Sequence, residues 1–302
     1  MSSTLNDYVT RGTSIPGIIP RADPVVWGPR GATEGSIDAD NLDAYETNGF
    51  LTVDSLLSPE EVEFFQAEIR DLAASKTLER DERFILERDS GDLRSIFEVH
   101  KVSEAFGRLA RDSRLLDRAR QILGSEVYIH QSRINYKPGF ESSPFYWHSD
   151  FETWHAEDGM PRMRALSVSL SLTENFEFNG SLMIIPRSHQ SFVVCTGVTP
   201  MDHYKESLKG RDVGIPDRAL LTELAHKNGI EQITGPAGSA TFFDCNCLHG
   251  SNGNITPFPR SNVFLVYNSV ENSCVEPFAA PGPRPTFLGA RDYTPLQGLP
   301  ND

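Results

Sequence analysis

The sequence predicts a mainly β fold with flanking helices, built around a double-stranded β-helix (jelly roll) core. Three observations support this prediction: helical patterns precede Gly124, short β-rich runs follow it, and Gly/Pro turns separate those runs. Helices first and strands second favour a helix-supported double sheet over a parallel α/β fold, in which the two would alternate. Residues 165–172 alternate small polar with apolar side chains, as in a barrel wall with two chemically different faces.

One domain over residues 1–302 is expected, because a β-rich domain can reach this length. Hydrophobic residues make up 38% of the chain, which is enough for a substantial core. Residues 1–35 have scattered Pro and Gly with little periodicity and predict an irregular N-terminal arm. Residues 277–302 are rich in Pro and Gly and predict an ordered covering segment at the C-terminal end.

Two helices are predicted before Gly124. The first follows Ser58-Pro59-Glu60-Glu61, which combines an N-cap serine, proline at the first helical position and a capping-box glutamate. It is expected to continue to residue 74, and its buried stripe consists of Val62, Phe65, Ile69 and Leu72. The second is expected over residues 103–123, with Gly124 ending it.

The strands are predicted from short runs rich in β-branched and aromatic residues, bounded by turn residues. These runs are residues 127–137, 164–173, 181–185, 239–243 and 262–268.

A formal net charge of −14 excludes nucleic acid and anionic lipid surfaces as expected partners. Residues 1–20 lack a basic segment followed by an apolar one, and no apolar stretch approaches membrane-spanning length. We therefore expect a soluble, cytoplasmic protein. The cysteines, Cys195, Cys245, Cys247 and Cys274, are too few and too clustered for a secreted disulfide framework, so reduced thiols are expected.

A candidate metal site consists of His148, Asp150 and His249. His148 and Asp150 are two residues apart, so on a strand both side chains would project to one face. His249 follows the strand-like residues 239–244 and would supply a distant third ligand. Two imidazoles and one carboxylate on one face of an iron leave three positions for O₂ and a bidentate 2-oxo acid. A His-x-Asp pair alone is common on surfaces and in hydrogen-bond networks.

Arg260, eleven positions after His249, is a candidate for binding the distal carboxylate of 2-oxoglutarate. A guanidinium fork pairs with a carboxylate through two hydrogen bonds, which Lys cannot reproduce. The alternative is an ordinary surface arginine.

The stretch Phe145-Tyr146-Trp147-His148-Ser149-Asp150-Phe151-Glu152-Thr153-Trp154-His155, continuing through Glu157-Asp158-Gly159-Met160-Pro161, resembles the signature of the ectoine hydroxylases. These enzymes are a branch of the phytanoyl-CoA dioxygenase-like family of iron(II)/2-oxoglutarate-dependent dioxygenases. The resemblance extends through residues 129–135, 249–252 and 259–262 and covers most of the chain after Ile37.

The resemblance implies a cupin-like jelly roll, a homodimer, and conversion of L-ectoine to 5-hydroxyectoine with 2-oxoglutarate and O₂, giving succinate and CO₂. It further implies a role in compatible-solute biosynthesis under osmotic stress. It assigns His148, Asp150 and His249 to Fe(II), matches Lys137, Arg260, Ser251 and Asn135 to 2-oxoglutarate, and matches Gln131, Thr153, Trp154 and Arg284 to the substrate pocket.

Ectoine is a small ring with a delocalised amidinium and a carboxylate. Arg284 could pair with the carboxylate and Trp154 could pack against the cationic ring, while Gln131 and Thr153 supply neutral hydrogen bonds. Because Arg284 lies in the C-terminal segment, that segment could close over the site and exclude water. The alternatives are a loop arginine and a core tryptophan.

Other interpretations remain open at this stage. Cys245-x-Cys247-x-His249 could form a zinc or soft-metal cluster, although buried small cysteines are the simpler expectation. His155 is a rival ligand, for which a structural role is favoured. Glu152, Glu157 and Asp158 could be acid/base carboxylates or hydrogen-bond partners that shape the loop. Competing functions are oxygenation of another small molecule, such as an amino acid or an acyl thioester, and a binding module without turnover.

Overall fold

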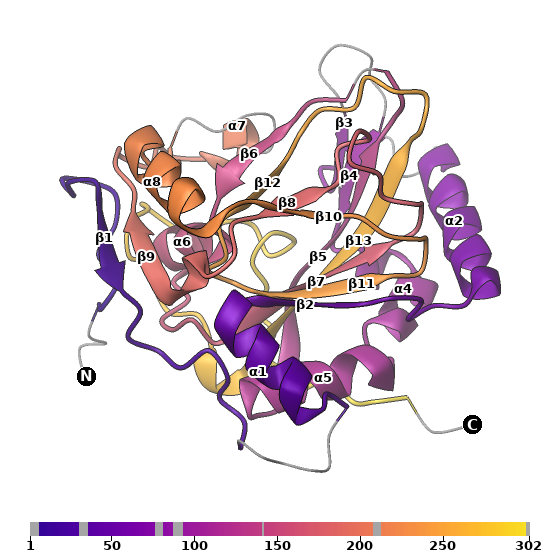
Figure 1. Ribbon diagram of the computed structural model, residues 1–302, viewed down its shortest axis with the longest axis horizontal. Coiled ribbons are helices and arrows are strands. Elements are labelled where there is room, and N and C mark those ends of the chain that lie inside the picture. The colour runs from indigo at the N-terminus through magenta and orange to yellow at the C-terminus, as the bar shows by residue number, and fades with distance from the viewer. Residues whose placement is uncertain are drawn as a thin grey trace.

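Two antiparallel sheets form the centre of the fold, with helices packed on the outer face of the larger one (Figure 1). The computed structural model describes residues 6–29, 36–75, 81–86, 93–140, 142–207 and 213–299. Residues 1–5, 30–35 and 300–302, for which the sequence predicts parts of the two terminal segments, lie outside the described residues.

The larger sheet has seven strands among the described residues. Their spatial order is β2 (Phe50–Val53), β11 (Ala240–Asp244), β7 (Ala165–Ser171), β13 (Arg260–Ser269), β5 (Val127–Lys137), β4 (Leu93–Phe97) and β3 (Phe84–Leu86). The smaller sheet has the order β10 (Glu231–Ile233), β8 (Leu182–Ile184), β12 (His249–Ser251) and β6 (Phe145–His148). The two sheets, with apolar contacts between them from β8, β10, β11 and β13, confirm the predicted jelly-roll core.

The helices on the larger sheet are α1 (Ala39–Asn48), α2 (Pro59–Ala74), α3 (Val99–Val102), α4 (Glu104–Leu109) and α5 (Ser113–Leu123). The remaining helical segments are α6 (Asp150–Thr153), the π-helix η1 (Trp154–Asp158), α7 (Tyr204–Ser207), α8 (Arg218–Asn228) and the 3-10 turns η2 (Ser188–Gln190) and η3 (Val270–Asn272). No helix of the described residues combines the length and the apolarity needed to cross a membrane.

The strand β7 has the two different faces that its alternating sequence predicts. Leu166, Val168 and Leu170 belong to the main hydrophobic core, which they share with the helices. Ser167 and Ser169 point the other way, toward the smaller sheet, where their hydroxyls take part in polar hydrogen bonds. The larger sheet therefore buries an apolar face against helices and presents a polar face to the space between the sheets.

The capping signals are confirmed. Ser58 accepts a hydrogen bond from the Glu61 backbone, and the Glu61 side chain accepts one from the Ser58 backbone. Gly124 ends α5 with a left-handed backbone, φ 61°. The prediction of one helix over residues 103–123 is wrong: Asp112 caps a new helix, so α4 and α5 are separate.

The N-terminal arm is not irregular throughout. Its strand β1 (Gly17–Pro20) pairs with β9 (Ser191–Val194) in a two-stranded sheet at the side of the molecule (Figure 1). The pattern Gly-Ile-Ile-Pro is too short for periodicity to reveal it. The C-terminal segment after Asn272 has no helix or strand in its described part and lies over β5, where the Ala290 amide donates to the His130 carbonyl.

Candidate active site

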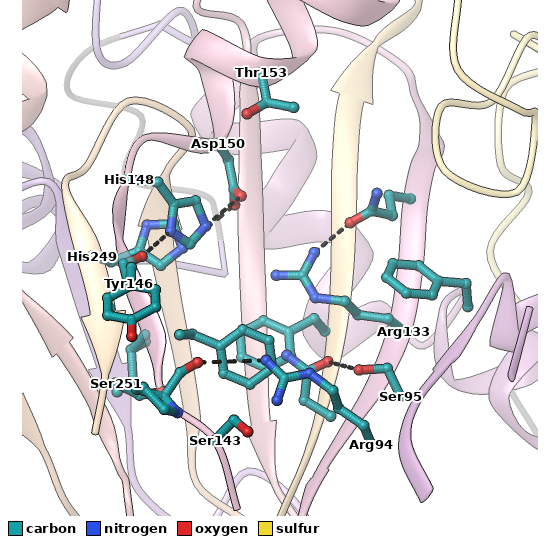
Figure 2. Close-up of a pocket in the computed structure, with 18 of the residues that line it drawn as sticks. Arg94, Ser95, Arg133, Ser143, Tyr146, His148, Asp150, Thr153, His249 and Ser251 are labelled. Atoms are coloured by element: carbon teal, nitrogen blue, oxygen red, sulfur yellow. Dashed lines mark hydrogen bonds and ion pairs between the residues drawn. The ribbon is translucent and has the colours of Figure 1, made fainter. Parts of the chain in front are cut away.

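His148, Asp150 and His249 come together at one wall of the space between the sheets (Figure 2). His249 lies opposite His148 in the β12–β6 pairing, and their ring centroids are 4.3 Å apart. The Nε2 atoms of His148 and His249 lie 3.5 and 3.8 Å from the Asp150 carboxylate oxygens. One ligand atom from each residue lies within 4.8 Å of the others, and all three residues are buried.

The orientation of both imidazoles is fixed by the backbone. Nδ1 of His148 bonds the Tyr146 carbonyl at 2.7 Å, and Nδ1 of His249 bonds the Cys247 carbonyl at 3.0 Å. These bonds place the protons on Nδ1, so both Nε2 atoms present a lone pair toward Asp150. Burial disfavours the Asp150 carboxylate, but His249, His148 and Arg133 hold its pKa well below the usual value. The donor set is the two-imidazole, one-carboxylate arrangement that suits iron(II).

Asp150 reaches this place by a different route from the one predicted. The strand β6 ends at His148, and Ser149 caps the short helix α6, which begins at Asp150. His148 and Asp150 therefore do not share a strand face. The hydroxyl of Ser167 donates to the Asp150 carboxylate from β7, on the larger sheet, at 3.2 Å.

The alternative cluster of Cys245, Cys247 and His249 does not form. The strand β11 ends at Asp244 and β12 begins at His249, so a turn separates the two cysteines from the histidine strand. The Cys247 thiol faces the Gly49 carbonyl at 3.2 Å. Among the described residues, the ligand atoms of His148, Asp150 and His249 converge, and the cysteines and His155 do not belong to this group.

A cavity of about 330 Å³ lies beside the three residues. Its wall includes all the predicted site residues except Lys137. Lys137 lies next to Arg260 in the β5–β13 pairing, and its ammonium donates to the Ser143 carbonyl at 2.6 Å. The structure therefore brings ten of the eleven predicted residues to one pocket, and the ammonium of Lys137 lies over the ring of Phe145, a residue of the pocket wall, 4.8 Å from its centroid.

Arg260 is a buried guanidinium without an acidic partner among the described residues. It is 2% exposed, donates one hydrogen bond to the Gly180 carbonyl at 3.0 Å, and its Nε has no partner. Burial lowers the pKa of Arg260 to about 10. The Ser251 hydroxyl, also in the pocket wall, has no hydrogen-bond partner in the described part of the chain. Unpaired buried groups of this kind are costly, which points to a bound anion.

Asn135 lies on the same face of β5 as Gln131, and its side-chain oxygen accepts a hydrogen bond from the Ser95 hydroxyl at 2.9 Å. Gln131 donates to the Leu288 carbonyl at 2.7 Å, which ties the C-terminal segment to the pocket wall.

Thr153 and Trp154 come from the helical segment that starts at Asp150. The Thr153 hydroxyl is buried, and no described residue bonds to it. The Trp154 indole is almost fully buried, and its ring meets His130 edge to face with centroids 5.3 Å apart. Both residues line the cavity, and Trp154 also belongs to a buried hydrophobic cluster.

Arg284 has a partner that the sequence did not indicate. Its guanidinium binds the Asp158 carboxylate through Nε at 2.8 Å and a terminal nitrogen at 2.6 Å. His130 also bonds this carboxylate, at 3.1 Å. Arg284 and His130 lower the pKa of Asp158 to about 2 despite its burial. Asp158 thus orients Arg284 at the pocket wall, as expected for a carboxylate that shapes the loop.

Two further arginines, Arg94 and Arg133, reach into the pocket from the side opposite the histidines (Figure 2). Arg133 donates to the side-chain oxygen of Gln131 and lies over the Phe264 ring, 4.8 Å from its centroid. Burial and the nearby Arg284 lower the pKa of Arg133. The alternation Gln131, Arg133, Asn135 along β5 places all three on one face, and this signal could have identified Arg133 from the sequence.

The pocket is therefore positively charged overall. Four arginines, Arg94, Arg133, Arg260 and Arg284, line it, and Asp150 is the carboxylate among the lining residues. Since Asp158 offsets Arg284, the excess positive charge lies at the other three. Such a pocket is suited to ligands that carry carboxylates.

Comparisons with known proteins agree with this geometry. The sequence model of the phytanoyl-CoA dioxygenase (PhyH) family matches residues 45–262. The ectoine dioxygenase of Streptomyces coelicolor is 58% identical over 96% of both chains, and that of Bordetella bronchiseptica is 52% identical over 96% of this chain and 94% of the other. The crystal structure of EctD from S. alaskensis with 2-oxoglutarate and 5-hydroxyectoine is 46% identical over 95% of both chains, with a TM-score of 0.87. The form with bound Fe has a TM-score of 0.88 at 44% identity over 98% of both chains.

Proposed function

The chain belongs to the phytanoyl-CoA dioxygenase family and, within it, to the ectoine dioxygenases. We propose its reaction from this membership and from the residues of its site. It is a 2-oxoglutarate-dependent dioxygenase that hydroxylates L-ectoine to 5-hydroxyectoine, releasing succinate and CO₂. The observation that carries this proposal is the solved relative with 2-oxoglutarate and 5-hydroxyectoine, which shares the fold of this chain over nearly its whole length.

His148, Asp150 and His249 are proposed to hold Fe(II). Their Nε2 and carboxylate donors converge, and the backbone bonds of both Nδ1 atoms fix the imidazoles for binding. When bound, the metal supplies oxidative chemistry, the activation of O₂ coupled to decarboxylation of 2-oxoglutarate. The protein's own contribution is to hold both organic reactants in fixed orientations beside it.

Arg260 is proposed to bind the distal carboxylate of 2-oxoglutarate, because its fork is buried without a carboxylate partner among the described residues. The free Ser251 hydroxyl can donate to the same ligand, and Asn135 lines the intervening wall. Lys137, next to Arg260 in the β5–β13 pairing, adds positive charge to this end of the pocket.

Ectoine is proposed to bind between Trp154 and the arginines. Arg133, which has one hydrogen bond and no carboxylate partner among the described residues, is proposed to pair with its carboxylate together with Arg284. Trp154 offers its ring to the amidinium, and Thr153 and Gln131 add hydrogen bonds. Trp154, Phe264 and Phe97 surround this region with apolar surface, which excludes water from the reacting carbon.

The proposal is tested by anaerobically reconstituting the protein with Fe(II), adding O₂ and 2-oxoglutarate, and measuring succinate with ectoine, proline or an acyl-CoA as substrate. Ectoine-dependent succinate with matching 5-hydroxyectoine is expected. Succinate formation with another substrate but not with ectoine would refute the substrate assignment. Binding of 2-oxoglutarate and ectoine without any turnover would instead identify a binding module.

We also propose a homodimer, a cytoplasmic location and a role in the osmotic stress response. Phe140, Phe178, Ile255 and Phe258 are exposed. The ring centroids of Phe178 and Phe258 lie 6.0 Å apart, and the Phe140 amide donates to the carbonyl of Thr256, next to Ile255. Such exposed apolar groups support a protein interface, since large apolar patches are uncommon on monomers. Four free, buried cysteines fit a reducing compartment. Sedimentation of the wild type and of Phe258→Glu would test the first of these: a dimer that the substitution dissociates supports it, and a wild-type monomer contradicts it.

A further inference from the structure

The segment that carries Asp150, Thr153 and Trp154 changes from α-helix (α6) to π-helix (η1) within nine residues. A π-turn is rare, occurs mostly at functional sites, and is less favourable than a regular helix. Something outside the segment must therefore stabilise this geometry. The structure provides it in the N-terminal arm, whose residues 6–12 lie against the side of the segment that faces away from the pocket.

The arm contacts the segment at successive residues. The side-chain oxygen of Asn6 bonds Nε2 of His155 at 3.0 Å. The Tyr8 ring meets the Phe151 ring edge to face, with centroids 5.2 Å apart. The Thr10 hydroxyl donates to the Glu152 carboxylate at 3.0 Å.

Arg11 makes the strongest of these contacts. Its guanidinium binds Glu152 through two hydrogen bonds, at 2.9 and 2.8 Å, and Glu157 through a third, at 2.6 Å. The remaining bond goes to the Thr199 hydroxyl at 2.9 Å. The side chains of Arg11 and Glu152 are each 1% exposed.

The position of Arg11 is itself tightly constrained. Its backbone has a left-handed conformation, φ 59°, and its amide donates to the Cys195 carbonyl at 2.8 Å. Gly214 closes over the ion pair: a Cβ at this position would lie 2.5 Å from the guanidinium. A non-glycine residue in this conformation is strained and persists only where the surroundings determine it.

The spacing of the two carboxylates explains what Arg11 achieves. Glu152 and Glu157 are five residues apart and bracket Thr153 and Trp154. On a regular α-helix, which has 3.6 residues per turn, side chains five residues apart point in different directions. In a π-turn the backbone hydrogen bond joins residues i and i+5, so side chains five residues apart lie on the same side. One guanidinium can therefore bind both carboxylates when the π-turn is present. Because a buried ion pair often adds little net stability, its main effect here is on geometry.

We propose that Arg11 is a positioning residue: by bridging Glu152 and Glu157 it fixes the π-turn and so orients Thr153 and Trp154 toward the substrate. This inference rests on the proposed function for the identity of that substrate. It assigns to the N-terminal arm a role in how ectoine is held, whereas Arg260 lies on β13, away from the segment, and binds 2-oxoglutarate independently.

The test compares Arg11→Lys, which keeps the charge but loses the fork, with Arg21→Lys. Arg21 is a matched control from the same arm, buried and paired with Asp244 at 2.8 Å, without a hydrogen bond to residues 150–158. Hydrogen exchange of residues 150–158, anaerobic calorimetric affinities for ectoine and 2-oxoglutarate, and the ratio of succinate to 5-hydroxyectoine are measured for both.

For Arg11→Lys we expect faster exchange in residues 150–158, an ectoine affinity lower by about tenfold to a hundredfold, an unchanged 2-oxoglutarate affinity, and more than one succinate per product. For Arg21→Lys the ectoine affinity and the product ratio stay at wild-type values. Equal behaviour of the two variants, or an unchanged ectoine affinity in Arg11→Lys, would overturn the inference.

If Arg11→Lys does not fold, Glu157→Gln is measured in its place, since it removes one charge of the bridge at constant shape. Its hydrogen exchange and ectoine affinity are expected to change in the same direction as those expected for Arg11→Lys, but by less. Failure of the wild type to turn over ectoine would refute the proposed function alone. In that case the exchange of residues 150–158 still tests the bridge.

Discussion

The variant Arg260→Met is expected to change stability and ligand binding in opposite directions. The guanidinium is buried and has no carboxylate partner among the described residues, and burial lowers its pKa well below the usual range of an arginine, to about 10. A change of this size corresponds to about 3 kcal/mol of unfavourable desolvation of the charged form. Methionine has a similar length and no charge. The ligand-free variant should therefore be as stable as the wild type or more stable, by at most about 3 kcal/mol.

The affinity for 2-oxoglutarate should be lower in the same variant. The guanidinium fork offers two charge-assisted hydrogen bonds to a carboxylate, each worth about 1.5–3 kcal/mol. Their loss, about 3–6 kcal/mol, corresponds to a 2-oxoglutarate affinity lower by roughly a hundredfold to ten-thousandfold. Arg260→Lys keeps a charge but not the fork and should lie between the wild type and Arg260→Met.

The assay is urea unfolding with and without 2-oxoglutarate, together with anaerobic calorimetry. The control is Arg21→Met, which leaves Asp244 buried and unpaired and should lose about 3–5 kcal/mol of unfolding free energy with an unchanged 2-oxoglutarate affinity. The reasoning is refuted if Arg260→Met is as destabilised as Arg21→Met, or if its affinity for 2-oxoglutarate equals that of the wild type.

Three other predictions concern the metal ligands, Thr153 and His130. Asp150→Asn and His249→Ala should lose Fe(II) on anaerobic gel filtration and have no turnover. Treatment of the wild type with a chelator should abolish its activity until Fe(II) is restored. A variant that retains iron would contradict the ligand assignment. Thr153→Val removes a buried hydroxyl that has no partner among the described residues, so the variant should be as stable as the wild type. Its KM for ectoine should rise and its KM for 2-oxoglutarate should stay the same. Parallel rises in both KM values would argue against a role of Thr153 in binding ectoine. Burial opposes protonation of His130, but Cys274 and the hydrogen bond to Asp158 raise its pKa from 6.5 to about 9, with Arg284 and Tyr128 also near. Because the folded-state pKa is raised, protonated His130 contributes fully to the free energy of unfolding below pH 6.5, and this contribution is lost as the pH rises through 9. The free energy of unfolding of the wild type should therefore fall by at most about 3 kcal/mol more than that of His130→Gln over this interval. Parallel curves of stability against pH for the two proteins would contradict this.

The strands of the larger sheet that were predicted are those with long, regular patterns. β5 begins and ends where the sequence indicates, at Val127 and Lys137, and α2 follows its capping box. The short strands β1, β6 and β12 were not predicted, because three or four residues carry too little periodicity and their pairing partners are distant in the chain.

Most residues predicted for the site line one pocket, but their arrangement could not be predicted from the sequence. The spacing of His148 and Asp150 suggested a shared strand face, whereas Ser149 starts a helix and Asp150 reaches the histidines from its first turn. The partner of Arg284, Asp158, lies far away in the sequence, and no local pattern connects them. The same holds for Arg11, whose carboxylate partners are brought to it by the tertiary fold.

The most direct test of the account is anomalous diffraction at the iron edge from crystals prepared anaerobically with Fe(II) and 2-oxoglutarate. A single strong peak is expected within about 2.0–2.2 Å of Nε2 of His148, Nε2 of His249 and a carboxylate oxygen of Asp150. A peak elsewhere, or one from which the His249 side chain is beyond bonding distance, would contradict it.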